Sequence, residues 1–399
     1  MFYLAIDQHA KQITVNLRNE SGTVTLRRQV STQPEKVRTF FSKLRDDTAT
    51  DGGYVAILEV CGFNDWLLAL LTEYGCQDTV LTQRELQDKH KTDRRDAHKL
   101  GEMLWVNRHR LAAGERLQNL RRVNPPSRED AAARQITQFR KRLGVQRTRV
   151  TNRIGGLLKK HNLQHACPTK GMKTRRARKW LAEVSVGPID RLELDQLITQ
   201  WKLVDEQVTA VEVKIKELQA VHRPAAFVSS IPGLKGYSGL AIASRVGDIN
   251  HFPTPDSLAN YWGLTPGCRN SGNAKQRLGS ITKQGSPLVR FLLSQAVMHV
   301  LRADPYMRKW YCQVKARRGA KIARVGVMRR LAVAIWYMLK HEEPYCTEGT
   351  PVYRRPPNRQ PAPAGQRGRT ESSGAGAPLA EQNSRAGALL TGGRDQMGP

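Results

Sequence analysis

Four carboxylates near the start of the chain have the chemistry and the spacing of a divalent-metal site. They are Asp7, Glu59, Asp93 and Asp96. Mg²⁺ prefers oxygen ligands in octahedral geometry, and two ions about 3.5 to 4 Å apart can stabilise the attacking and the leaving oxygen of a phosphodiester. Singly, each acid is as well explained as a strand-end, first-turn or ion-paired residue. Jointly, they predict a metal site of the nuclease type.

The four acids lie where predicted strands end and where a predicted helix begins. Asp7 and Glu59 each follow a run of five apolar residues. If these runs form neighbouring strands, their ends hold two carboxylates at fixed positions. Asp93 and Asp96 are three residues apart, and such residues share a helix face with about 5 to 6 Å between their Cβ atoms. All four side chains can therefore converge on one site.

Short strand-like and helix-like segments alternate through this part of the chain. The predicted strands are 2–7, 12–18, 23–30, 54–59 and 78–81, and the predicted helices are 34–44, 64–74 and 92–105. Three antiparallel strands followed by strands that alternate with helices are the order of a ribonuclease H-like fold. Periodicity alone also allows another mixed α/β sheet.

The chain is strongly basic, with 65 Lys and Arg residues against 35 Asp and Glu, a formal charge of +30 and a pI near 10.4. This excess predicts a nucleic-acid partner first and an anionic membrane second, because a cationic surface releases counterions from a polyanion. The apolar runs are too short to span a bilayer, and the first residues lack the pattern of a signal peptide. The six cysteines show no metal or redox spacing. We expect an intracellular, cytoplasmic protein.

The pattern predicts a multidomain α/β plus α protein. The expected units are a ribonuclease H-like metal-binding domain at 1–110, a basic coiled-coil region at 111–222, a mainly helical domain at 223–345 and a disordered basic tail at 346–399.

Two long helical arms make up the predicted coiled coil. The second arm has a heptad seam at Leu197, Trp201, Val204, Val208, Val211, Ile215 and Leu218. The first arm matches less well: Ile136, Phe139, Leu143, Val150 and Leu157 lie on the seam, and Gln146 and Arg153 interrupt it.

Basic residues cluster on the first arm and on the link between the arms. The outer face of the first arm is predicted to carry Arg140, Arg142, Arg147, Arg149, Lys159 and Lys160. A charge run of this kind is usually a solvated face, but its one-sided sign favours nucleic-acid contact. The predicted nucleic-acid-binding residues are Arg147, Arg149, Arg153, Lys159, Lys160, Arg175, Arg176, Arg178, Lys235, Arg269, Lys275 and Lys283.

The third unit contains two loops with possible functions. Residues 231–236 place two glycines around Leu234-Lys235 before a helix, as in a helix-hairpin-helix turn that holds a phosphate with backbone N–H groups. A tight turn that only joins two helices is equally consistent. Ser271 precedes a glycine in a loop rich in Arg and Lys, where a serine can attack phosphorus and form a covalent intermediate. A Ser-Gly turn is the ordinary alternative.

These motifs as a set resemble the DEDD transposases of the insertion sequence 110 family, whose relatives include Piv-type DNA invertases and bridge-RNA-guided recombinases. The matching motifs are Asp7, the strand ending at Glu59, Lys91-Thr92-Asp93 with Asp96-Ala97, Gln146-Arg147-Thr148-Arg149 with Asn152-Arg153-Ile154, Ile231-Pro232-Gly233 through Gly247-Asp248-Ile249, Gly263-Leu264-Thr265-Pro266, Ser271-Gly272, Ile281-Thr282-Lys283-Gln284-Gly285 and Asp304-Pro305. The resemblance covers about residues 1–345. Residues 8–10, Gln-His-Ala, depart from the small polar run of many members.

The resemblance implies a RuvC-like domain in which the four acids bind Mg²⁺, as two ions, and a transposase domain in which Ser271 forms a phosphoserine link with DNA. It also implies dimers and tetramers joined through the coiled coil, with composite active sites that take the acids and the serine from different subunits. A structured bridge RNA from the element would pair with donor and target DNA. Ser280 and Ser286 are close enough in sequence to be alternative nucleophiles.

Three other functions fit parts of the pattern. A Holliday-junction nuclease would use the same acids with a metal-activated water and would need no serine. A site-specific DNA invertase would share the serine chemistry. A binding protein on a degenerate nuclease fold would have lost the metal site, but all four acids are present.

Overall fold

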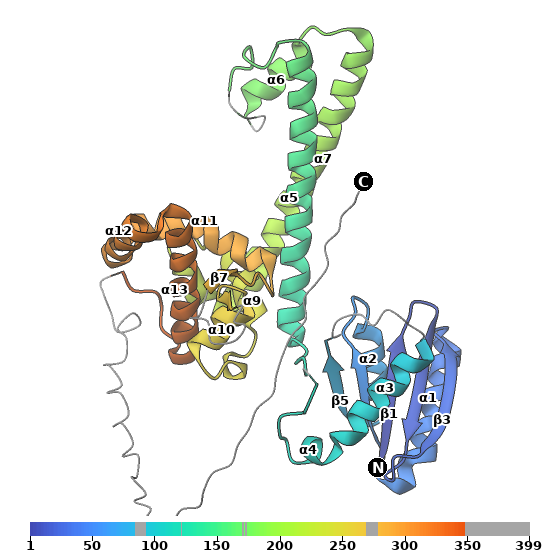
Figure 1. Ribbon diagram of the computed structural model, residues 1–399. Helices are drawn as coiled ribbons and strands as arrows, with labels where there is room; N and C mark the ends of the chain where they lie inside the picture. The colour runs from blue at the N-terminus through green and yellow to red at the C-terminus, as the bar shows by residue number, and fades with distance from the viewer. Residues whose placement is uncertain (84–92, 121, 170, 172–173, 269–277, 348–399) are drawn as a thin grey trace, which may run out of the picture. The chain divides into compact units, whose positions relative to one another are not determined.

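The computed structural model describes residues 1–83, 93–120, 122–169, 171, 174–268 and 278–347. Figure 1 shows a sheet domain, a long helical pair and a mainly helical C-terminal domain. The strands are β1 Phe2–Gln8, β2 Gln12–Arg18, β3 Val24–Ser31, β4 Tyr54–Glu59, β5 Cys76–Thr82, β6 Pro266–Cys268 and β7 Leu278–Ile281. The helices of the sheet domain are α1 Pro34–Thr48, α2 Asp65–Glu73, α3 Asp93–Val106 and α4 Arg108–Ala112. The remaining α-helices are α5 Arg128–Lys160, α6 Arg175–Glu183, α7 Pro188–Val221, α8 Arg223–Ser229, α9 Tyr237–Val246, α10 Pro255–Tyr261, α11 Pro287–Ala303, α12 Pro305–Arg318 and α13 Ala320–His341.

The five-stranded sheet has the order β3-β2-β1-β4-β5. β2 is antiparallel to both of its neighbours, whereas β4 is parallel to β1 and to β5. The predicted sequence of three antiparallel strands followed by strands alternating with helices is therefore confirmed. Parallel neighbours bring the carboxyl ends of β1 and β4 to one edge of the sheet.

Helices cover both faces of this sheet (Figure 1). On one face, α1 and α2 bury Phe41 and Leu67 against strand residues such as Ile6 and Val15. On the other face, α3 buries Leu100 and other apolar residues against the sheet. The alternation of side chains along each strand decides which residue meets which helix layer.

The sheet domain extends beyond the predicted boundary at residue 110. Leu117 and Leu120 are buried in the cluster under α3, Val123 packs against the cluster on the opposite face, and Arg122 forms a β-bridge with Thr82. Residues 113–123 show no helical periodicity in the sequence, so the packing of Leu117, Leu120 and Val123 against the sheet domain could not be predicted from it.

Helices α5 and α7 pack side by side over most of their length (Figure 1). The seam predicted on α7 is largely buried, with Leu197, Trp201 and Ile215 each exposed by less than a tenth. On α5 three predicted seam residues, Leu143, Val150 and Leu157, are buried as expected. The alternate positions of the seam lie one residue further along than predicted: Phe139 is 43% exposed, and Ile154, not Arg153, is buried against α7.

The C-terminal domain is mainly helical, as expected, with one small antiparallel hairpin formed by β6 and β7. α8 and α9 are joined by a turn in which Gly233 and Gly236 have φ of 89° and 51°. A Cβ on Gly233 would approach His299 to 2.9 Å, so both the conformation and the packing require glycine there. The expected tail, from residue 348 on, lies outside the described residues. Within the described chain, no helix is both long and apolar enough to cross a bilayer.

Candidate active site

Asp7 and Glu59 lie on the same face and at the same edge of the sheet. Tyr3 and Ala5 of β1 and Val55 and Ile57 of β4 all belong to the cluster under α3. Because strand side chains alternate, Asp7 continues the series of Tyr3 and Ala5, and Glu59 continues that of Val55 and Ile57. The parallel register places Ile6 opposite Leu58, so the two acids occupy adjacent positions at the strand ends.

Helix α3 packs on this face of the sheet, and the other two acids belong to its first turn. Asp93 is the first residue of α3 and Asp96 the fourth. Ala97 and Leu100, which follow them, are buried against the sheet, and Asp96 is itself partly buried. The side chain of Asp93 lies outside the described part of the structure. The backbone thus places the first turn of α3 on the face that bears Asp7 and Glu59.

Asp7 is mostly buried and has a basic neighbour. Its side chain is 13% exposed, and its Oδ2 lies 3.0 Å from Nε2 of His9. Asp7 also stands directly opposite Thr14 in the β1–β2 ladder. The Thr14 hydroxyl is buried and has no hydrogen-bond partner among the described residues. Burying such a group without a partner costs free energy.

Gln8, which lies in the segment that differs from the family pattern, forms hydrogen bonds with the loop that follows β4. Gln8 donates from Nε2 to the carbonyl oxygen of Phe63 at 2.9 Å and accepts at Oε1 from Nδ2 of Asn64 at 2.7 Å. Asn64 also donates to the carbonyl oxygen of Glu59 at 3.1 Å. The sequence alone assigned no role to Gln8, His9 or Asn64. Their position directly after the strand-end Asp7 is a signal that could have identified Gln8 and His9, whereas Asn64 lies five residues after Glu59 and carries no such signal.

The donor set suits a hard divalent ion, since carboxylate oxygens are the ligands that Mg²⁺ takes. Asp7 and Glu59 fit this chemistry by type and by position. Among the described side chains, however, no group of three or more His, Cys, Asp or Glu residues is close enough to hold a metal. The described chain therefore contains a pair of acids at the sheet edge, and the completed site stays a prediction.

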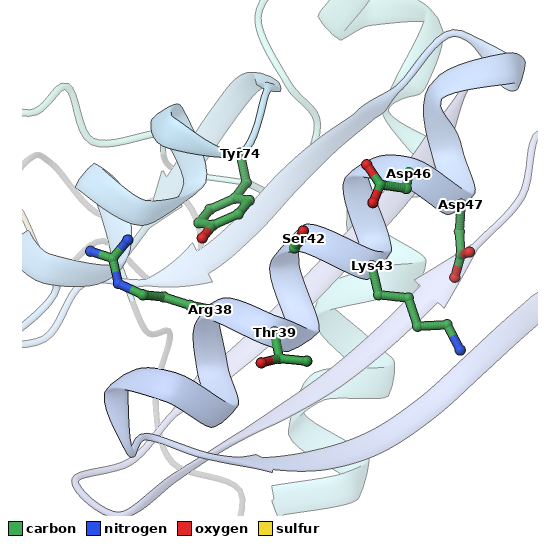
Figure 2. A pocket seen from close by; sticks show the side chains of 7 residues that line it. All are labelled: Arg38, Thr39, Ser42, Lys43, Asp46, Asp47 and Tyr74. Carbon is green, nitrogen blue, oxygen red and sulfur yellow. The ribbon is translucent and has the colours of Figure 1, made fainter.

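A shallow pocket elsewhere on the domain has a different character. It lies over α1 and is lined by Arg38, Thr39, Ser42, Lys43, Asp46, Asp47 and Tyr74 (Figure 2). It contains side chains of both signs and none of the predicted site residues. Because α1 packs on the face opposite α3, this pocket is separate from the acids.

Two of the arginines predicted on the outer face of α5 point instead to α7. Three ion pairs join the helices, Arg140–Glu212 at 2.6 Å, Arg147–Asp205 at 2.6 Å and Lys160–Asp190 at 2.8 Å. The outer-face placement of Arg140 and Arg147 is therefore wrong. The carboxylates on α7 neutralise these arginines in the protein itself. The hydrogen bonds that Lys160 and His161 donate lower the pKa of Asp190.

The other predicted nucleic-acid contacts divide into three groups. Exposed side chains are Arg149, Arg153, Lys159, Arg175, Arg176, Lys235 and Lys283. Arg178 is partly exposed. Arg269 and Lys275 lie outside the described residues. The exposed members remain available to a polyanion.

The candidate nucleophile Ser271 also lies outside the described residues. The segment that contains it is bounded by β6 and β7. Of the two alternatives, Ser286 accepts a hydrogen bond from the backbone N–H of Val289 and caps α11. Ser280 is exposed in β7. The cap gives Ser286 a structural role that its sequence position did not reveal.

A buried polar chain ties α5 to the start of the C-terminal domain. Ser127 donates to Asp130 at 2.9 Å, and Nε2 of His222 lies 3.0 Å from the other Asp130 oxygen. Nδ1 of His222 accepts from the N–H of Ala225 at 3.2 Å, so the proton of a neutral ring is on Nε2. Arg134 adds a bond to the carbonyl oxygen of Ser244 at 2.6 Å.

Two family models match this chain in the order of its domains. The model of DEDD transposases of the IS110 type, described as "Transposase", matches residues 4–163. The model described as "Transposase IS116/IS110/IS902 family" matches residues 225–312. The first match contains the sheet domain and α5, and the second contains the segment between β6 and β7.

Several proteins are similar to the chain over long stretches. A protein of Pseudomonas aeruginosa named as a family 20 transposase is 24% identical over 340 residues, which are 81% of this chain and 92% of the relative. The transposase y4qE of Sinorhizobium fredii is 32% identical over 53% of this chain and 49% of its own length. A 43.6 kDa protein of the insertion element IS110 of Streptomyces coelicolor is 28% identical over 33% of this chain and 32% of its own length.

Proposed function

Because the chain belongs to the insertion sequence 110 family of DEDD transposases and is a DNA transposase, we propose that it cleaves and rejoins DNA strands through a serine nucleophile assisted by a divalent metal. The observation that carries this proposal is the placement of Asp7 and Glu59 at one edge of the sheet, on the face covered by α3. The strand order supports a ribonuclease H-like, RuvC-like assignment of the domain.

In this proposal Asp7, Glu59, Asp93 and Asp96 hold Mg²⁺, as two ions. When bound, the metal neutralises charge that develops on the phosphate oxygens. The protein's part is to fix the ligands: β1 and β4 set two carboxylates, and the first turn of α3 supplies the other two. His9 orients Asp7 through its ring nitrogen.

The chemical step belongs to Ser271. Its Oγ loses its proton and attacks phosphorus, so that the Oγ–P bond forms while the P–O bond to one DNA strand breaks, and the leaving oxygen of that strand takes up a proton. Attack by a DNA hydroxyl on the phosphoserine reverses these changes and joins the new strands. The covalent intermediate replaces the broken phosphoester bond by a new one to serine, so that the strands can be rejoined without an external energy source.

Further partners follow from the family and from the charge of the chain. We propose that a structured bridge RNA pairs with donor and target DNA and that exposed cations such as Arg149, Arg175 and Lys235 hold these nucleic acids. The pair α5–α7 would join subunits into dimers and tetramers. The acids and the serine of one active site would then come from different subunits.

Trapping of a protein–DNA adduct tests the serine. Labelled DNA carrying the element ends is incubated with protein and Mg²⁺ and is resolved under denaturing conditions. Wild type should give a covalent band. Ser271→Ala should lose the band and strand cleavage and keep DNA binding, since the hydroxyl is removed without loss of charge.

Two neighbouring serines serve as matched controls. Ser280→Ala should retain the adduct, and Ser286→Ala should retain it with a small loss of stability, because it removes the cap of α11. A full adduct with Ser271→Ala would move the nucleophile elsewhere. Cleavage without any adduct in wild type would favour a nuclease that uses water.

A further inference from the structure

The C-terminal domain carries a long stretch of sequence that is almost free of acids. Between Asp256 and Glu342 the sole acidic residue is Asp304. Its side chain is 2% exposed, accepts from the backbone N–H of Met307 at 2.8 Å and accepts from the Tyr345 hydroxyl at 2.7 Å. The stretch therefore offers no acidic side chain to solvent from its described part.

Within this stretch, α12 and α13 concentrate the positive charge. Residues 305–341 contain ten Lys and Arg residues and no Asp or Glu. Five of these cations gather around the junction of the two helices at Gly319, and all five are exposed: Lys315, Arg317, Arg318, Lys321 and Arg324. We call these five residues the basic elbow. None of them was among the nucleic-acid contacts predicted from the sequence, and the family match ends at residue 312, before the first of them.

The basic elbow has a regular arrangement on both helices. Lys315 and Arg318 are three residues apart at the end of α12, so they share a face, and Lys321 and Arg324 do the same at the start of α13. Gly319 has φ of 83°, a conformation that glycine adopts without strain, and it lets one helix follow the other directly.

Packing behind the elbow holds the two helices together. A Cβ on Gly326 of α13 would approach the Trp310 ring of α12 to 2.7 Å, so the helices touch at this point. The guanidinium of Arg330 lies 4.6 Å from the centre of the same ring. Ala323 and Val327 are fully buried beneath the elbow. The cations are thus displayed from a fixed support and lose little backbone entropy when they bind.

We propose that the basic elbow contacts the phosphate backbone of duplex DNA. The inference rests on the proposed function, which it deepens by assigning a DNA contact to α12 and α13. Neutralising phosphates with Lys and Arg releases counterions and gives affinity without reading sequence. The two packed helices hold their cations in fixed positions, at the end of α12 and the start of α13. Such an arrangement suits the regularly spaced phosphates of duplex DNA.

Duplex DNA fits the surface better than single-stranded nucleic acid. Proteins that hold single strands combine cations with exposed aromatic rings on which bases stack. Residues 315–324, the segment that contains the basic elbow, include no aromatic residue. Its chemistry is that of phosphate contact alone.

A matched pair of variants tests the inference with the full-length protein. Arg317→Gln with Arg318→Gln removes two elbow charges. Arg223→Gln with Arg329→Gln removes two arginines of the same domain that already face carboxylates, Glu342 at 2.6 Å and Asp256 at 3.0 Å. Binding of a labelled DNA duplex of mixed sequence is measured by anisotropy between about 50 and 200 mM salt.

The elbow variant should bind about tenfold more weakly near physiological salt, and the slope of log K against log salt should fall in magnitude by about 1 to 2. The control variant should match wild type within about twofold, because its arginines are neutralised in the protein. Arg317→Lys with Arg318→Lys keeps the charges and should keep the slope. Unfolding midpoints verify that all variants are folded.

An unchanged slope in the elbow variant would overturn the inference, as would an equal loss in the control. If binding of an RNA duplex or single strand falls while that of duplex DNA does not, the surface serves RNA and the inference is also wrong. This binding test does not depend on the identity of the nucleophile. Ser271→Ala can refute the proposed serine chemistry while the salt dependence of DNA binding still tests the basic elbow. Likewise, an unchanged salt dependence can refute the elbow contact while the adduct test still supports the serine.

Discussion

The two faces of the five-stranded sheet are made by the same strands but differ in the side chains that they bury. Towards α1 and α2 the strands present Ile6, Val15 and Leu58, all nearly inaccessible and apolar. The face towards α3 is mixed: Ala5 and Ile57 pack in an apolar cluster, and Asp7, Thr14 and Asn16 add polar side chains. Buried atoms of Thr14 and Asn16 lack partners among the described residues. We call this mixed side the polar face.

The difference shows how one sheet can combine an apolar core on one side with polar residues, including those of the proposed site, on the other. The apolar face gains free energy from burial, at roughly 25 cal/mol per Å² of apolar surface. The polar face gives up part of that gain, since unsatisfied buried groups cost about 1 to 3 kcal/mol each. Local losses of this kind are expected where side chains are placed for chemistry and not for packing.

The largest expected effect is on activity and concerns the polar face. Asp7→Asn or Asp96→Asn should lower Mg²⁺-dependent strand cleavage by about a thousandfold or more, because a metal ligand contributes several kcal/mol to transition-state stabilisation. Asp46→Asn on the exposed side of α1 is the matched control and should leave cleavage unchanged. Cleavage is measured on labelled DNA with Mg²⁺ and with EDTA. Full activity of both site variants would reject the metal site and the contrast between the faces.

The next effect is on stability and concerns the apolar face. Phe41 is completely buried between α1 and the sheet. Phe41→Ala should lower the free energy of unfolding by about 3 to 5 kcal/mol, because it removes a large apolar surface and leaves a cavity. Denaturant unfolding measures the change. A loss below about 1 kcal/mol would mean that this face is not the main source of stability.

The smallest effect compares two adjacent residues of β2 that point to opposite faces. Thr14→Val removes a buried hydroxyl without a described partner and should leave the free energy of unfolding unchanged or raise it by up to about 1 kcal/mol. Val15→Thr makes the reverse change on the apolar face and should lower it by about 1 to 3 kcal/mol. Both are measured by denaturant titration. Equal losses in the two variants would erase the distinction between the faces.

Much of the sheet domain could be predicted because its signals are local. The strands around Asp7 and Glu59 are short apolar runs with clear ends, and the structure places them within a residue or two of the prediction. Their parallel pairing then follows from the alternation of strands and helices. The boundary near 110 could not be predicted, because Leu117 and Leu120 reach the core through an irregular segment.

On α5 the sequence was insufficient for a different reason. Arg153 lies on the stripe of α5 predicted to face α7, whereas Arg140 and Arg147 lie on the stripe that does face it. Because both stripes contain arginine, the surface of α7 decides which of them is buried. Asp205, which lies 58 residues from Arg147 along the chain, provides the charge that favours the observed stripe. Neither helix alone contains that information.

The sequence by itself determined the family, the acids at the strand ends, the alternating elements and the excess of positive charge, because these are encoded in residue types and short spacings. Only the tertiary structure decided which face of the sheet receives Asp7 and Glu59, which arginines of α5 are neutralised by α7, and which cations stay exposed at the basic elbow. The physical reason is that burial and charge neutralisation are properties of contacts between distant segments. A carboxylate or a guanidinium acquires its role from what lies opposite it.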